Sequence, residues 1–118
     1  MSEIKKLTER IIKFRDARDW KQFHKPKDLA VSLSLEAAEV LEHFQWKNEM
    51  EAVEYVKTHK DEIAEELADV LNYLLLTAYE FDIDIVEALN KKIDKSENKY
   101  PVEKAKGNAK KYTELEKL

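Results

Sequence analysis

The sequence predicts an all-α protein, and three observations lead to that class. The chain of 118 residues contains only one glycine and two prolines. Nowhere do its apolar residues alternate with the period of two that a half-buried strand requires. Charged residues make up 39% of the chain and apolar residues 43%, a balance typical of long amphipathic helices with charged outer faces. At this length we expect a single domain over residues 1–118.

Composition also argues against several classes of function. The formal net charge is −4, and no patch rich in lysine and arginine offsets it, so we expect no nucleic-acid polymer as a partner. The absence of cysteine excludes disulfides, thiol catalysis and thiolate metal sites. The N-terminus has no apolar signal segment, and no stretch approaches the ~18 apolar residues of a membrane span. We therefore expect a cytoplasmic protein with no membrane partner.

The first half of the chain predicts two helices. Residues 2–18 carry apolar residues at spacings of three and four, namely Ile4, Leu7, Ile11 and Phe14. A second helix is expected from Pro26 to about Trp46, because Lys25 precedes a proline and is pushed away from helical angles. Either Pro26 or Asp28 begins this helix. Residues 47–60 are expected to form a short helix or an irregular connection.

The second half predicts two more helices and a tail. The third helix covers about residues 60–80 and the fourth residues 82–99, with Asp82 or Asp84 as the cap of the fourth. Pro101 ends that element. Residues 102–118 are polar and contain the only glycine, so we expect a loosely packed C-terminal arm.

Three consecutive leucines in the third helix predict association. Successive helical residues are 100° apart, so Leu74, Leu75 and Leu76 cannot all face one core. Four helices in so short a chain would struggle to bury such a helix. We therefore expect a four-helix bundle completed by homo-oligomerisation, with the third helix at the interface. The alternative is a scattering of exposed leucines, which monomers tolerate.

Two pairs of acidic residues share one spacing, 36-EAAE-39 on the second helix and 66-ELAD-69 on the third. At 100° per residue, Glu36 lies about 20° and Glu39 about 80° outside the apolar arc of the second helix, on the same side. Glu66 and Asp69 likewise belong to a stripe beside an apolar arc. The two arcs comprise Leu29, Leu33, Ala37, Val40, Leu41 and Phe44 on the second helix, and Ile63, Leu67, Val70, Leu71, Leu74 and Ala78 on the third.

Across an antiparallel interface the two acidic pairs would converge as four oxygen ligands. Such a set suits a hard cation, Mg²⁺ or Mn²⁺, rather than zinc. The spacing alone leaves open the alternative that these acids form a solvated surface.

The acids and the blocks around them resemble the MazG-like nucleotide pyrophosphohydrolases, an all-α family. The E-x-x-E…E-x-x-D pattern is accompanied by 18-RDWKQFHKP-26, 43-HFQWK-47, 65-EELADVLNY-73, 99-KYP-101 and 110-KKYTEL-115. The likeness covers roughly residues 5–115 and is greatest to the single-domain branch that includes dCTP pyrophosphatases. It implies Mg²⁺-dependent hydrolysis of a nucleoside triphosphate to the monophosphate and pyrophosphate. It also implies a homodimer or homotetramer that removes surplus or modified deoxynucleotides.

The resemblance also assigns roles to individual residues. The metal would be held by Glu36, Glu39, Glu66 and Asp69, and we expect Glu39 to be the general base if it is not only a ligand. The substrate would be bound by Trp20, Lys21, Gln22, Phe23, His24, Trp46 and Tyr73. Aromatic side chains suit this role because they stack on bases, whereas the alternative for the tryptophans is an anchor at a helix end.

One position departs from the dCTP-preferring members, which have a histidine where this chain has Ile11. An apolar side chain cannot replace the hydrogen bond of a histidine, so the preferred base is open. Two other functions also remain open: a non-catalytic helical dimerisation module, and a regulator that binds nucleotide without hydrolysing it.

Overall fold

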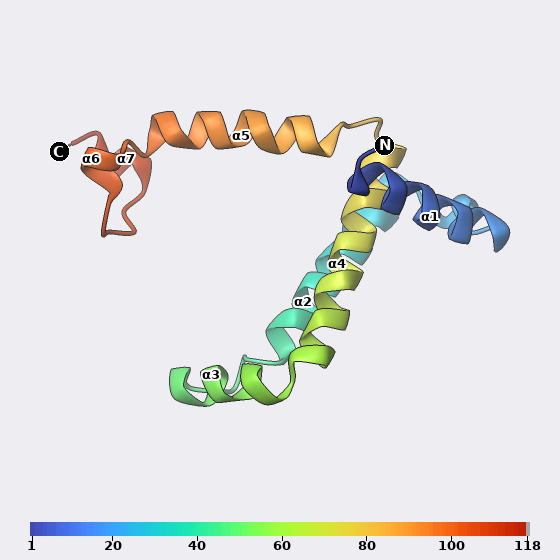
Figure 1. Ribbon diagram of the computed structural model, residues 1–118, viewed down its shortest axis with the longest axis horizontal. Helices are drawn as coiled ribbons and strands as arrows, with labels where there is room; N and C mark the ends of the chain where they lie inside the picture. The colour runs from blue at the N-terminus through green and yellow to red at the C-terminus, as the bar shows by residue number, and fades with distance from the viewer. Residues whose placement is uncertain (118) are drawn as a thin grey trace. The chain divides into compact units, whose positions relative to one another are not determined.

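The computed structural model describes residues 1–117, and its elements are all helical (Figure 1). In chain order they are α1 (Glu3–Ala17), the 3-10 turn η1 (Lys21–Phe23), α2 (Pro26–Glu42), α3 (Glu49–Thr58), α4 (Lys60–Glu80), α5 (Ile85–Lys99), α6 (Val102–Ala105) and α7 (Tyr112–Leu115). The predicted all-α class is therefore confirmed. Within the described residues, no helix combines the length and the apolar character needed to cross a membrane.

The chain forms two compact units, Met1–Ile83 and Asp84–Leu118. The prediction of a single domain over residues 1–118 stays a prediction.

Capping side chains explain where the helices begin. Asn48 and Glu51 form a capping box, in which the Asn48 side chain accepts from the Glu51 backbone N–H at 2.9 Å. Residues 47–60 were expected to form either a short helix or an irregular connection. The capping box explains why a helix, α3, forms there. The cap of α5 is Asp84, which accepts from the Glu87 backbone N–H at 3.1 Å. Asp82 instead takes a left-handed φ of 55° in the preceding loop.

Helix α2 ends at Glu42, four residues before the predicted end at Trp46. The α-helical hydrogen-bond pattern gives way there to a tighter turn, in which the backbone N–H of Phe44 donates to the carbonyl of Leu41, three residues back, at 2.9 Å. The ammonium group of Lys47 donates to the His43 carbonyl at 2.6 Å and satisfies one of the last carbonyls of the helix.

The unit Met1–Ile83 is built around α4. Helices α2 and α4 lie side by side and antiparallel, and α1 packs near the C-terminal end of α4 (Figure 1). Leu75 and Leu76 are each 2% exposed, because α4 has neighbours on two sides. Two of the three leucines that we predicted at an interface between copies are thus covered within the chain, and Leu74 is half-buried. Oligomerisation itself stays a prediction.

The predicted apolar arcs are only partly buried. Leu29 is fully buried, but Leu41 is 58% and Leu67 is 54% exposed. Helices α2 and α4 meet instead along a seam that includes the acidic stripes at the margins of the arcs. Helical periodicity defines a stripe and its margins, but it does not say which margin meets the neighbouring helix.

An ion pair fixes α1 on α4. The Arg15 side chain is 3% exposed, and its Nη1 donates to the Glu80 carboxylate at the end of α4. Its Nη2 lies 3.0 Å from Asp16 Oδ1, and the guanidinium carbon lies 5.8 Å from the centroid of the Tyr79 ring. A buried arginine is rare unless paired, so this contact defines how α1 sits on the unit.

The unit Asp84–Leu118 contains more structure than the loosely packed arm that we predicted for residues 102–118. Leu115 of α7 is buried, and the rings of Tyr100 and Tyr112 meet edge to face with centroids 6.3 Å apart. Lys99 Nζ lies 4.7 Å from the centroid of the Tyr112 ring. These apolar and aromatic residues are few in a polar segment, which is why composition alone suggested a loose arm.

Candidate metal centre

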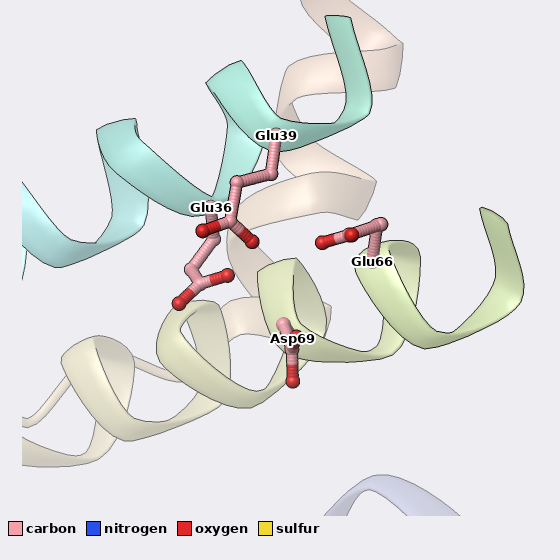
Figure 2. A group of neighbouring side chains, drawn as sticks. All are labelled: Glu36, Glu39, Glu66 and Asp69. Atoms are coloured by element: carbon pink, nitrogen blue, oxygen red, sulfur yellow. The ribbon is translucent and has the colours of Figure 1, made fainter. Parts of the chain in front are cut away.

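Two neighbouring helices bring four carboxylates to one place. Glu36 and Glu39 project from α2, and Glu66 and Asp69 from α4 (Figure 2). Each residue offers one oxygen atom, and these four atoms lie within 4.8 Å of one another. The spacing of three residues puts both members of each pair on one face of their helix. We call these four residues the acidic cluster; its geometry agrees with the spacing argument, and metal binding by it stays a prediction.

Burial and mutual repulsion shift the protonation of the acidic cluster. Burial, followed by a hydrogen bond with Glu39 and the charges of the other acids, raises the pKa of Glu36 to about 7. A hydrogen bond with Glu39, followed by burial, raises the pKa of Glu66. Two carboxyl groups share a hydrogen bond only when one of them carries a proton. Because Glu39 raises the pKa of both Glu36 on α2 and Glu66 on α4, it is the carboxylate that connects the two acidic pairs.

The donor set fits a hard divalent cation. Glu36 Oε2 is buried and has no hydrogen-bond partner within residues 1–117. A buried ionised oxygen is costly unless a proton or a cation compensates it. All the donors in the acidic cluster are carboxylate oxygens, which suit Mg²⁺ and Mn²⁺. A divalent metal could thus replace the protons that the cluster otherwise retains.

A histidine and a tyrosine that we did not assign from the sequence lie beside the acidic cluster. His43 Nε2 is 3.7 Å from Glu66 Oε1, and His43 Nδ1 is 2.6 Å from the Tyr55 hydroxyl. The position of His43 had a signal in the sequence, because it follows Glu39 by four residues and therefore lies on the same face of the helical turn. Tyr55 had none, since it belongs to the segment whose helical state was undecided.

The two tryptophans predicted to bind the nucleobase lie beyond opposite ends of α2. That helix has 17 residues, which at 1.5 Å per residue separates its ends by about 26 Å. Trp46 is 88% exposed. Trp20 meets the Phe14 ring edge to face, with centroids 5.7 Å apart. One chain therefore cannot place both indoles against the same base.

The other predicted substrate residues occupy varied surroundings. Lys21 and Phe23 are exposed in η1, and Gln22 Nε2 donates to the Asp19 carbonyl at 3.0 Å. Tyr73 is half-buried on α4, one helical turn beyond Asp69. The role of these residues in binding substrate stays a prediction.

His24 lies near the pair that fixes α1 on α4. Its Nδ1 is buried with no hydrogen-bond partner in the part of the chain that the structure describes. Burial, followed by the charge of Arg15, lowers the pKa of His24, while Glu80 acts in the opposite direction. This environment favours a neutral imidazole, which would meet a phosphate by a hydrogen bond and not by charge.

Known proteins are similar to this chain in sequence and in fold. Residues 31–115 match the MazG-like family. The dCTP pyrophosphatase 1 of Mus musculus is 40% identical over 104 residues, which cover 86% of this chain and 61% of the relative. The protein of that name from Homo sapiens is 38% identical over the same length and the same shares. The chain thus spans about 61% of the length of these curated relatives.

A solved structure is similar over nearly its whole length. The crystal structure of a pyrophosphatase from Archaeoglobus fulgidus superposes with a TM-score of 0.81 at 43% sequence identity. The match covers 86% of this chain and 94% of that one.

Proposed function

The chain belongs to the MazG-like family, and from that premise we propose that it is a Mg²⁺-dependent nucleoside triphosphate pyrophosphohydrolase. The proposed products are the nucleoside monophosphate and pyrophosphate, and the proposed role is removal of surplus or non-canonical deoxynucleotides such as dCTP. The observation that carries this proposal is the acidic cluster, in which four carboxylate oxygens lie within 4.8 Å of one another. Pyrophosphatase names among its relatives support the same reaction.

The acidic cluster explains why such an enzyme would need a metal. Four carboxylates repel a triphosphate, which itself carries about four negative charges. Bound Mg²⁺ would supply the positive charge that offsets this repulsion and stabilises charge on the phosphate oxygens. We assign Glu36, Glu39, Glu66 and Asp69 to holding it.

The proposed chemical step uses Glu39 as general base. Glu39 contributes to the raised pKa of both Glu36 and Glu66, so it is the acid of the cluster that interacts with a carboxyl group on each of the two helices. Glu39 takes a proton from a water as the water oxygen bonds to the α-phosphorus. The bond from the α-phosphorus to the bridging oxygen breaks, and pyrophosphate leaves.

Substrate binding in this proposal requires two copies of the chain. Trp20 and Trp46 are separated by the length of α2, so a pocket that uses both draws them from different copies. Leu41 and Leu67, at 58% and 54% exposed, offer apolar surface on α2 and α4 for such an association. We therefore propose a homodimer or homotetramer whose nucleotide pocket combines Trp20, Trp46 and Tyr73 with the 21–24 segment.

The proposal is tested by product analysis with a panel of canonical and 5-modified nucleoside triphosphates in Mg²⁺. Glu36→Gln and Asp69→Asn should each lower pyrophosphate release by at least about 100-fold. Losing an outer-shell partner of a metal ligand already lowers metal affinity or activity by about 10–100-fold, and losing the ligand itself should lower it at least as much. Glu65→Gln is the matched control, since Glu65 neighbours the cluster residue Glu66 but is exposed and outside the cluster. Its rate should stay within about twofold of wild type.

Two results would overturn the proposal. Release of inorganic phosphate and a nucleoside diphosphate would show cleavage between the β- and γ-phosphates instead of between the α- and β-phosphates. No product from any nucleotide, with folded protein and either Mg²⁺ or Mn²⁺, would favour a helical dimerisation module or a nucleotide-binding regulator.

A further inference from the structure

The residue beside the acidic cluster that carries no role so far is His43. It lies in the turn that follows α2, and its side chain is 14% exposed. Its two ring nitrogens face different partners: Nε2 is 3.7 Å from Glu66 Oε1, and Nδ1 is 2.6 Å from the Tyr55 hydroxyl oxygen. The imidazole therefore links α3 to a carboxylate on α4.

The two contacts select one tautomer of the imidazole. A neutral histidine has one nitrogen that donates and one that accepts. If Nδ1 carried the hydrogen, the lone pair of Nε2 would face the Glu66 carboxylate, and the two would repel each other. If the Tyr55 hydroxyl donates to Nδ1, the Nε2–H points at Glu66 Oε1 and attracts it. The geometry therefore favours the Nε2–H form.

Tyr55 is held in place from several sides. Its ring stacks on that of His59, with centroids 3.9 Å apart and planes 6° from parallel, and the Phe44 ring meets it edge to face at 5.9 Å. Lys47 Nζ lies 4.1 Å from the Tyr55 centroid and donates to the His43 carbonyl. The phenol is thus fixed by packing, and its hydroxyl can fix the ring of His43.

We propose that His43 is a positioning residue for the acidic cluster: held by the Tyr55 hydroxyl, its Nε2–H orients the Glu66 carboxylate for metal binding. This proposal rests on the proposed function, because it assumes that Glu66 is a metal ligand. At 3.7 Å the Nε2–Oε1 contact is longer than a hydrogen bond, and a shift of roughly 1 Å would make it one. Outer residues of this kind orient a ligand and limit the rotamers that it must give up on binding.

The test measures Mn²⁺ affinity by the electron paramagnetic resonance signal of free Mn²⁺, on full-length protein without nucleotide. His43→Leu should weaken Mn²⁺ binding by about 10–100-fold, the usual effect of losing an outer-shell partner. Tyr55→Phe removes only the hydroxyl and should weaken binding by about fivefold or more. His43→Gln, whose amide N–H can replace Nε2–H, should keep affinity closer to wild type than His43→Leu. Tyr79→Phe is the matched control, and its affinity should equal that of wild type.

A second measurement identifies which ring nitrogen of His43 carries the hydrogen. Long-range ¹H–¹⁵N spectra at about pH 8, where imidazoles in general are neutral, should show the hydrogen of His43 on Nε2. In Tyr55→Phe that preference should weaken. A hydrogen on Nδ1 in the wild-type protein would overturn the proposal even if the Leu variant failed to fold.

The outcomes separate this proposal from the proposed function. If wild type binds Mn²⁺ and folded His43→Leu and Tyr55→Phe bind it equally well, His43 has no positioning role, while the proposed function stands. If wild type binds no Mn²⁺, or Glu36→Gln binds it as tightly as wild type, the proposed metal site is wrong, and the role of His43 falls with it.

Discussion

Glu36 links the electrostatics of the acidic cluster to the stability of the fold. Its pKa is raised from an ordinary value of 4.5 to about 7, so the folded state holds this proton more tightly than the unfolded chain does. The resulting stabilisation is fully present below about pH 4.5 and is lost as the pH rises through about 7. With chelator present, the melting temperature of wild type relative to Glu36→Gln should therefore fall between about pH 5 and pH 8.

Mg²⁺ supplies the control for this pH series. Because a metal binds the ionised carboxylates, its stabilising effect should grow with pH over the same interval. At 100 times its dissociation constant it should stabilise the fold by about 2.7 kcal/mol. A difference between wild type and Glu36→Gln that did not change with pH would show that Glu36 titrates normally.

At the residue scale, the sequence was informative where helical periodicity applies. The four acids could be grouped because each pair has a spacing of three on a clearly predicted helix. The pairing of His43 with Tyr55 could not be predicted, since it crosses 12 residues and depends on how α3 folds back on the end of α2. The tautomer of His43 is selected only when the end of α2, Tyr55 of α3 and Glu66 of α4 lie together.

At the scale of elements, α1 depends on one charged contact with α4. Arg15 is 3% exposed, and the Glu80 side chain is 19% exposed. Within the described residues, Glu80→Gln would leave the buried guanidinium with Asp16 as its only remaining ion-pair partner. Removing one partner of a buried ion pair destabilises a fold by about 3–5 kcal/mol. Because Glu80 is partly exposed, we expect its substitution to lower the free energy of unfolding by about 3 kcal/mol. Urea denaturation measures it.

The same substitution at an exposed pair is the control. Glu54 and Lys57 of α3 lie 2.9 Å apart but are 72% and 63% exposed. Glu54→Gln should therefore cost less than about 1 kcal/mol, because such pairs gain little in water. Equal losses for the two variants would mean that the Arg15–Glu80 contact is no more important to α1 than a surface pair.

Elements with strong local signals could be predicted well. The third predicted helix, residues 60–80, coincides with α4, and Asp84 was one of two cap candidates for α5. The end of α2 and the burial of its apolar arc were not predictable, because both depend on neighbours. The turn after Glu42 is stabilised by Lys47, and the face of α2 toward α4 includes its acids as well as part of its arc.

At the scale of the whole molecule, the chain leaves its proposed nucleotide pocket incomplete. The 17 residues of α2 separate Trp20 from Trp46, and exposed Leu41 and Leu67 supply apolar surface near the seam with α4. Association between copies would bury that surface and bring one tryptophan from each copy to the same base. In solution we therefore expect sedimentation to report a mass of at least two chains.

Mixing two inactive variants tests whether the pocket is shared. Trp20→Ala and Trp46→Ala should each lose most activity, because base stacking is worth about 1–3 kcal/mol per base. If each site of a dimer takes Trp20 from one copy and Trp46 from the other, a mixed dimer has one intact site and one that lacks both indoles. Random exchange makes half of the dimers mixed, so the equimolar mixture should recover about a quarter of wild-type activity.

The control mixes Glu36→Gln with Asp69→Asn, two variants of residues that meet within one chain. Every site then carries one altered acid, whichever copy supplies the tryptophans, so this mixture should stay inactive. Subunit exchange is verified with a tagged chain. Verified exchange without recovery in the tryptophan mixture would show that the two indoles do not serve one pocket from different copies, and since α2 prevents them from meeting within one chain, at least one would then have no place at the base.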